Sequence, residues 1–132
     1  MNKIFLVFLN YFFFIFHTIF TIFNLSGWFF KNTRKLHLVT MILTIISWYL
    51  LGIWYGWGYC FCTDWHWKIR ELLGYKDISN SYIHFLLLKL TRIDFPENLV
   101  VNSVIIVFFV CIFLSIFFNI RDIYLSKSKR KY

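Results

Sequence analysis

Three long stretches of the chain lack any lysine, arginine, aspartate or glutamate, and this absence decides the class of protein. The stretches cover residues 4–30, 36–63 and 98–120, and each exceeds the roughly 20 residues with which a helix crosses a hydrocarbon core of about 30 Å. Because a backbone in hydrocarbon has no water to bond with, each stretch must form a helix or part of a closed barrel. The runs show no strict polar–apolar alternation, which excludes the barrel. The sequence therefore predicts an all-α integral membrane protein.

Residues that would keep a separate domain soluble are scarce. Hydrophobic residues make up 60% of the 132 positions, aromatic residues make up 24%, and the mean hydropathy is +0.66. Such a composition would give an insoluble surface in water, so we predict a single membrane domain over residues 1–132. The first apolar run is longer than that of a secretory signal, and no small-x-small cleavage pattern follows it. We therefore expect it to be retained as a span.

Acidic residues are few as well, with six against 14 Lys and Arg, so the net charge is +8. The cations lie in loops and in the tail rather than on one folded face, and no nucleic-acid-binding motif accompanies them. We therefore exclude nucleic acid as a partner. The expected partners are the lipid bilayer, other membrane-protein subunits or a second copy of the chain.

The cations gather between the first two runs and after the third, which sets the expected orientation. By the positive-inside rule, this side of the membrane is cytoplasmic. We predict spans over about residues 4–30, 36–60 and 98–120, followed by a basic tail over 121–132, with the N-terminus outside and the C-terminus in the cytoplasm. The cations that decide this are Lys31, Arg34, Lys35, Arg121, Lys127, Lys129, Arg130 and Lys131.

The segment after the second span begins with a short amphipathic pattern over about residues 64–73. Thr63 or Asp64 can cap a helix there, and Gly74 can end it. We expect this helix to lie on the membrane.

A second short helix is predicted over about residues 79–91, apolar on most sides. It would be only about 18 Å long at 1.5 Å per residue, so we expect it to be embedded or re-entrant. A fourth, tilted span is the alternative if the helix extends to Phe95. Asp94 and Glu97 form a capping-box pattern before the last span.

Polar residues inside the predicted spans recur at helical spacing. Each set occupies one face of its helix, and polar groups at membrane depth turn away from lipid. We therefore expect the sets to converge inside the bundle, as helix-packing contacts. The sets are Asn10, His17 and Asn24; His37, Thr40, Thr44 and Ser47; and Cys111, Ser115 and Asn119.

His17 lies at the centre of its span, where a buried imidazole is expected to be neutral and hydrogen-bonded. A proton relay or a haem ligand is the alternative. Haem bound by two histidines needs a second one at similar depth, and His37, His66 and His84 all lie nearer an interface.

The densest chemistry follows the second span, where tryptophans and tyrosines predict an aromatic belt at the headgroup level. Cys60, Cys62, Asp64 and His66 alternate there, so an extended backbone would place them on one side. They would then offer zinc or copper ligands, with Cys60, Cys62 and His66 as the candidates and His84 able to complete the site. Alternatively, the two thiols form a strained redox disulfide or pair with another chain. The remaining interpretation is a structural belt and helix cap. The sequence identifies no particular cofactor, and a metal ion is the candidate.

Several different short motifs are spread along the chain. The residues that carry them are His17, His37, Gly56, Trp57, Cys60, Thr63, Arg70, Gly74, Tyr82 and Ile83. With these motifs the chain resembles a family of small bacterial membrane proteins, domain of unknown function 2784. It departs from the family pattern at Phe61 and Cys62, where the family has Pro and Leu, and at His66, where the family has an acid. The resemblance implies a helical fold, a bacterial inner membrane location and a site around Cys60, Thr63, His66 and Arg70, without a reaction.

Two classes of function remain open from the sequence. The first is a non-enzymatic structural or accessory subunit, favoured by the small size, the short loops and the lack of a nucleophile–base or phosphate-binding motif. The second is a membrane-embedded redox, metal or lipid/quinone-handling protein that uses an outer-face cluster. The candidate residues of that cluster are Cys60, Cys62, Thr63, Asp64, His66, Arg70 and His84.

Overall fold

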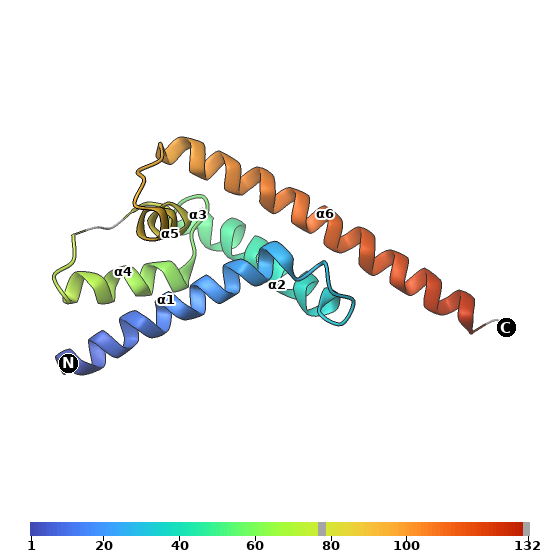
Figure 1. Cartoon of the computed structure of the whole chain (residues 1–132), viewed down its shortest axis with the longest axis horizontal. Helices are drawn as coiled ribbons and strands as arrows, with labels where there is room; N and C mark the ends of the chain where they lie inside the picture. Colours follow the sequence, from blue (N-terminus) through green and yellow to red (C-terminus); the bar gives the residue numbers. More distant parts are fainter. Residues whose placement is uncertain (77–78, 131–132) are drawn as a thin grey trace.

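The computed structural model describes residues 1–76 and 79–130, and within these ranges it is helical, with no strand (Figure 1). This confirms the predicted all-α class. The elements in chain order are α1 (Lys3–Ser26), α2 (Arg34–Ile46), the π-helical segment η1 (Ser47–Leu51), α3 (Gly52–Tyr55), α4 (Phe61–Leu72), α5 (Tyr82–Thr91) and α6 (Glu97–Lys129).

Three helical stretches in the described ranges are long and apolar enough to cross a membrane, as the sequence predicted. They are α1, the stretch Arg34–Tyr55 that joins α2, η1 and α3, and α6. Helix α5 has 10 residues, which gives about 15 Å against a hydrocarbon core of about 30 Å. A fourth span at α5 is therefore not supported.

The side chains of the three long helices have the distribution expected of helices in hydrocarbon. Ile4 and Phe8 of α1 and Ile106 and Phe113 of α6 are exposed, while several of the buried positions carry polar groups. Helices surrounded by lipid gain little from burying apolar side chains and instead turn their polar groups toward one another. The buried polar residues on these helices are Asn10, His17, Arg34, His37, Ser115 and Asn119.

The longer helices run back and forth along the long axis of the molecule, while α5 lies across it and is seen nearly end-on (Figure 1). Helix α1 runs from the N-terminus toward the centre, α2 returns toward α3, and α4 lies along the first half of α1. Helix α5 lies between α4 and the start of α6, and α6 then runs to the opposite end of the molecule. Because Arg34 at the start of α2 contacts Asp122 near the end of α6, these two positions share one side of the bundle.

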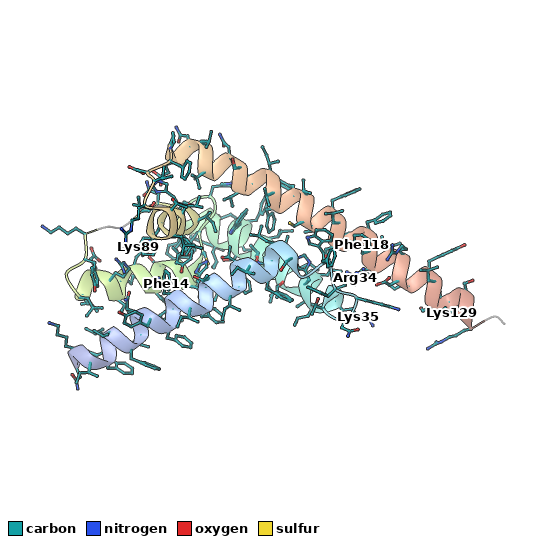
Figure 2. All side chains as sticks on the ribbon, viewed as in Figure 1. Phe14, Arg34, Lys35, Lys89, Phe118 and Lys129 are labelled. Atoms are coloured by element: carbon teal, nitrogen blue, oxygen red, sulfur yellow. The ribbon has the colours of Figure 1, made fainter. Side chains whose placement is uncertain are left out.

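A small apolar core joins α2 to α6. Met41, Phe108 and Cys111 form it, and Trp28 and Trp48 pack against it. Cys111 is buried there, as expected for a cysteine in the middle of a span. A second apolar cluster lies on α5, where Phe14 of α1 packs against Tyr82 and Phe85; Figure 2 labels Phe14.

The second span ends earlier than the predicted residue 60, because glycines turn the chain after Tyr55. Gly56 and Gly58 have φ values of 102° and 79°, a region that side chains with a Cβ rarely adopt. The hydroxyl of Ser47 donates to the carbonyl of Tyr59 at 3.1 Å and holds this turn against η1.

The last span continues past the predicted residue 120. Helix α6 has 33 residues and ends at Lys129, so residues 121–129 of the expected basic tail are helical, while residues 131 and 132 lie outside the described ranges. No proline or glycine interrupts residues 121–129, and lysines in the last turn favour the helix by facing the negative end of its dipole.

Two predicted helix caps are wrong. Helix α4 begins at Phe61 with Cys60 in the N-cap position, so Thr63 lies inside the helix rather than capping it. Helix α6 begins after Pro96 without a side-chain cap, because Asp94 contacts His84 instead of forming a capping box.

Helix α4 packs against a span instead of lying apart on the membrane. It runs antiparallel to the first half of α1, so that Thr63 lies beside His17 and His66 lies beside Asn10. Its buried face carries polar side chains, and its exposed face carries Phe61 and Trp65. The buried side chains need polar partners, and α1 provides them.

Candidate functional site

Two buried polar regions hold the bundle together. We name the first the Arg34 junction, formed by Asn24, Arg34, His37, Thr40, Ser115, Asn119 and Asp122. We name the second the α4 cluster, formed by Asn10, His17, Thr63, His66, Arg70 and Tyr82. The residues of both regions come from several helices, and α1 contributes to each.

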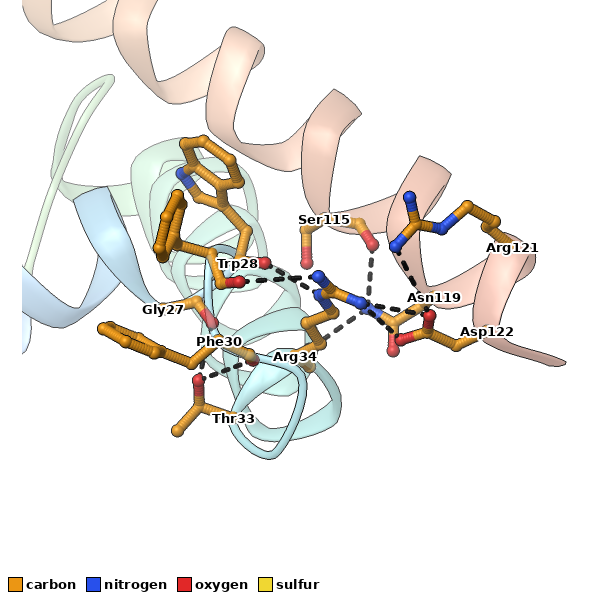
Figure 3. Close-up of polar contacts among 10 residues, drawn as sticks. Gly27, Trp28, Phe30, Thr33, Arg34, Ser115, Asn119, Arg121 and Asp122 are labelled. Atoms are coloured by element: carbon orange, nitrogen blue, oxygen red, sulfur yellow. Dashed lines mark hydrogen bonds and ion pairs between the residues drawn. The ribbon is translucent and has the colours of Figure 1, made fainter. Parts of the chain in front are cut away.

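Arg34 connects the α1–α2 loop to α6 at one end of the bundle (Figure 3). Its Nη1 donates to both carboxylate oxygens of Asp122, at 3.0 and 2.8 Å, and its Nε donates to the carbonyl of Trp28 at 3.0 Å. The guanidinium also lies 4.7 Å from the ring centre of Phe118; Figure 2 labels both side chains. A buried ion pair offsets the cost of removing its charges from water only when additional hydrogen bonds satisfy both groups, and the Arg34–Asp122 pair has such bonds.

His37 is fully buried in the same junction, with partners at both ring nitrogens. Its Nε2 lies 2.8 Å from the carbonyl of Asn24, and its Nδ1 lies 2.9 Å from Oγ of Ser115. A carbonyl can only accept, so Nε2 donates to Asn24, and the Ser115 hydroxyl is the partner of Nδ1. Both ring nitrogens are therefore satisfied.

Members of all three predicted polar sets meet around this histidine, whereas Asn10 and His17 of the first set face α4. The Asn24 side chain accepts from Thr40 at 2.8 Å and donates to Thr44 at 3.3 Å. Nδ2 of Asn119 donates to the carbonyl of Arg34 at 3.1 Å. Residues from all three spans thus share one network, as the spacing predicted.

Gly27 is required for this close approach. A Cβ atom at position 27 would lie 2.8 Å from Cδ2 of His37 and 2.8 Å from the carbonyl oxygen of Phe23. Both neighbours are fixed, one by its hydrogen bonds and the other by the helix backbone.

The α4 cluster is centred on the side-chain oxygen of Asn10. Nε2 of His66 lies 3.0 Å from Oδ1 of Asn10, and Nη1 of Arg70 lies 3.4 Å from the same atom. His66 has no exposed surface, and Arg70 is 5% exposed. Two side chains one turn apart on α4 thus converge on one acceptor of α1.

These contacts determine the protonation state of His66. Arg70 can only donate, so the atom of Asn10 that it contacts is the oxygen. That oxygen in turn requires a proton on Nε2 of His66. Burial first, and the charge of Arg70 second, lower the pKa of His66 to about 4, so the ring is neutral at pH 7 and Nδ1 carries a lone pair. That Nδ1 is buried and has no hydrogen-bond partner among the described residues.

Aromatic rings enclose the cluster. The rings of His17 and Tyr82 stack with their centres 3.9 Å apart, and Nδ1 of His17 lies 3.5 Å from Oγ1 of Thr63. The Arg70 guanidinium lies 4.4 Å from the ring centre of Tyr75, within the range of a cation–π contact. The rings that surround His66 are Phe13, Trp67, Tyr82 and Phe85.

Cys60 and Cys62 lie at the start of α4 as free thiols, both half-buried. The Cys62 thiol donates toward the Cys60 sulfur, and together with Thr63 this outweighs burial and lowers the pKa of Cys60 to about 6. The contact with Cys60 and burial raise the pKa of Cys62. The two thiols are therefore chemically different.

The residues predicted as one site fall into four places, of which the thiol pair at the start of α4 is the first. Thr63, His66 and Arg70 meet α1, while Asp64 forms an exposed pair with Lys68 at 2.7 Å. His84 contacts Ser79, Asp94 and the carbonyl of Phe95 near the start of α6. The alternation that suggested a metal site is broken by the helix that begins at Phe61, and no group of three or more His, Cys, Asp and Glu side chains is arranged to hold a metal ion in residues 1–76 and 79–130.

The contact of Asn10 with His66 and Arg70 was not predicted from the sequence. One signal for it existed, because His66 and Arg70 are one helical turn apart and Asn10 and His17 are two turns apart. Each pair forms a polar face that needs a partner in the membrane. Nothing in the spacing showed that these two faces would meet each other.

Comparison with known proteins gives one informative match. The chain matches a family profile described as Protein of Unknown function (DUF2784) over residues 7–120. This range contains the α4 cluster and most of the Arg34 junction. No curated protein and no solved structure matches the chain.

Proposed function

The chain belongs to the DUF2784 family of proteins of unknown function, and we propose that it works as a non-enzymatic accessory subunit in a cell membrane, with the α4 cluster as its contact to a partner. The bundle tied together at the Arg34 junction would hold α4 and α5 in place. The cluster on α4 would then hold a preformed acceptor, Nδ1 of His66, which a second molecule reaches only when the aromatic rings around it move aside.

The lone pair on Nδ1 of His66 is the observation that carries this proposal. Leaving a buried acceptor without a hydrogen bond costs about 1–3 kcal/mol, and such groups are rare in folded proteins. In the described part of the chain, His37 is equally buried and both of its nitrogens have partners, whereas Nδ1 of His66 has none. The missing donor is therefore expected from a second molecule.

The proposed orientation places the N-terminus outside and the C-terminus in the cytoplasm of a bacterial inner membrane. The cationic α1–α2 loop and the last turns of α6 share one side of the bundle through the contact of Arg34 with Asp122, and the positive-inside rule assigns that side to the cytoplasm. Reporter fusions after residue 132 and within residues 79–81 test this orientation. A C-terminal reporter that is active outside contradicts it.

Lipid or quinone handling is the second candidate function. Aromatic rings surround His66, and the lone pair of Nδ1 could accept from a hydroxyl group on an amphipathic ligand. Such mostly apolar surroundings with a few convergent polar groups are typical of small-molecule sites.

Native mass spectrometry of the protein, released from its own membranes in mild detergent, separates the two candidates. A co-purifying protein of fixed stoichiometry supports the accessory role, and a bound lipid or quinone supports the second candidate. Replacing His66 by Leu, which has a similar volume, should release the bound species, while Asp64→Asn on the exposed face of α4 should retain it.

The thermal unfolding midpoint of each variant shows whether the fold survives, and Asn10→Ala gives a second way to disturb the cluster. Retention of the bound species by a folded His66→Leu protein contradicts the proposed role of His66. A wild-type protein that retains no other molecule contradicts both candidates.

A further inference from the structure

The proposed function leaves the two thiols at the start of α4 unused. Cys60 occupies the N-cap position with extended backbone angles, φ −126° and ψ 117°, and Cys62 lies in the first turn. Both are free and only half-buried, whereas Cys111 is buried among the spans. A reagent that reaches the start of α4 can therefore distinguish the pair from the third cysteine.

The spacing of the pair permits a disulfide. Two residues along a chain advance at most about 7 Å, even when fully extended. The Cα atoms of Cys60 and Cys62 are thus within or near the separation that a disulfide bridges. A hydrogen bond from the Cys62 thiol is the largest cause of the lowered pKa of Cys60.

The two sulfurs are suited to different steps of thiol–disulfide exchange. Cys60 precedes a helix of 12 residues, where the N–H groups of the first turn and the positive end of the dipole favour a thiolate. The thiolate is the nucleophile in exchange, and a thiol with a pKa near the ambient pH is the best attacking group. Cys62 has a raised pKa and keeps its proton until Cys60 has reacted.

We propose that Cys60 and Cys62 are a dithiol–disulfide couple that reduces a disulfide of a second molecule, with Cys60 as the attacking sulfur and Cys62 as the resolving sulfur. The Cys60 thiolate attacks one sulfur of that disulfide, forms a mixed disulfide and expels the other sulfur as a thiolate. Cys62 gives its proton to the expelled thiolate and attacks the Cys60 sulfur. This closes the Cys60–Cys62 disulfide and releases the second thiolate, which takes a proton from water. Two electrons pass from the couple to the second molecule.

This inference goes beyond the proposed function, because it does not use the lone pair of His66. Cys60 and Cys62 can prove unreactive while the α4 cluster still binds a partner, and they can react with a disulfide while the cluster binds none. Assays of thiol chemistry therefore test it separately.

The experiment uses the full chain in detergent with Cys111→Ser, so that only Cys60 and Cys62 remain. The protein is treated with oxidised glutathione, quenched with acid, alkylated and weighed intact by mass spectrometry. We expect a protein with one internal disulfide and no retained glutathione. With Cys62→Ala added, the reaction should stop at one glutathione on Cys60, and with Cys60→Ser added, Cys62 should react about tenfold more slowly at pH 7.

The pH dependence of alkylation separates a reactive couple from two ordinary thiols. The alkylation rate of Cys60 should rise with a midpoint near pH 6 and shift to higher pH in Cys62→Ala. Cys62→Ser keeps a donor toward Cys60 and should restore most of the midpoint. Helix content, measured by circular dichroism, should be the same in all variants.

Three results would overturn the proposal. They are two thiols that stay free at high oxidised glutathione, two separate glutathione adducts without an internal disulfide, and a disulfide-linked dimer of the chain. Oxidised thioredoxin in place of oxidised glutathione then tests whether the couple also reduces a protein disulfide. The Cys60–Cys62 disulfide forms only if the thioredoxin disulfide is reduced.

Discussion

The Arg34 junction and the α4 cluster use the same kinds of side chain and leave them in different states. Each contains an arginine, an asparagine and a fully buried histidine. In the junction, both nitrogens of His37 have partners, and Arg34 faces a carboxylate. In the α4 cluster, one nitrogen of His66 has a partner and the other has none in the described ranges. Burial and residue type therefore do not separate a structural histidine from a candidate functional one, but the partners of each ring nitrogen do.

The largest expected effect comes from breaking the ion pair of the junction. Arg34→Met leaves the Asp122 carboxylate with only the more distant Arg121, at 3.8 Å, and should lower the thermal unfolding midpoint in detergent by on the order of 10 °C. Removing both charges in Arg34→Met with Asp122→Leu should recover most of the loss. Lys68→Ala, which removes an exposed pair, is the control and should change the midpoint by roughly 2 °C or less. A loss in Arg34→Met no larger than in the control would contradict a structural role for the junction.

The two histidines should differ when both are replaced by leucine. His37→Leu leaves the Asn24 carbonyl and the Ser115 hydroxyl unsatisfied and should destabilise the fold by about 2 kcal/mol. His66→Leu removes one hydrogen bond and leaves Asn10 with its contact to Arg70, so the cost should be about 1 kcal/mol or less. Chemical unfolding of both variants in the same detergent measures the difference. Equal losses of unfolding free energy in His37→Leu and His66→Leu would contradict the distinction between the Arg34 junction and the α4 cluster.

The pH dependence of stability should come from the α4 cluster. The pKa of His66 is lowered to about 4 in the folded state, against about 6.5 in an unfolded chain. Below pH 6.5 the unfolded state therefore binds a proton that the folded state does not, and stability falls as the pH drops from 6.5 toward 4. Unfolding midpoints measured across this window should fall more steeply for the wild type than for His66→Leu. Parallel curves would show that His66 is not held neutral by the fold.

The smallest expected effect is at Thr63. A lost N-cap would cost about 1 kcal/mol, but Thr63 lies inside α4, and its one cross-helix contact, with His17, is 3.5 Å long. Thr63→Ala should therefore cost less than about 0.5 kcal/mol. Chemical unfolding of Thr63→Ala and the wild type in the same detergent measures this difference in stability. A loss of about 1 kcal/mol, the value of an N-cap, would show that Thr63 caps α4.

The spans and the polar contacts around His37 could be predicted from the sequence because both follow from helical spacing, whereas the pairing of Arg34 with Asp122 was not predicted. Long uncharged runs specify helices by length alone, and polar residues on one face of such a helix have no stable place except against another polar face. His37 and Ser115 were therefore expected to meet inside the bundle, and they do.

The α4 cluster could not be predicted as fully, because it depends on where a short helix docks. The spacing of His66 and Arg70 defines a face of α4, but the turn at Gly56 and Gly58 decides that this face meets Asn10. The alternation of Cys60, Cys62, Asp64 and His66 suggested one site only if the backbone were extended. Helix formation from Phe61 onward separates Asp64, which pairs with Lys68, from His66, which faces Asn10.

Nitrogen-15 NMR of histidine-labelled protein in detergent tests the central distinction most directly. The chain has four histidines, and His37→Leu and His66→Leu assign the two that matter. At pH 7 we expect the His66 ring to be neutral with the proton on Nε2, its Nδ1 to have the shift of a lone pair without a donor, and Nδ1 of His37 to have the shift of a hydrogen-bonded nitrogen. A protonated Nδ1 on His66, a titration midpoint near 6.5, or an Nδ1 shift equal to that of His37 would contradict this expectation.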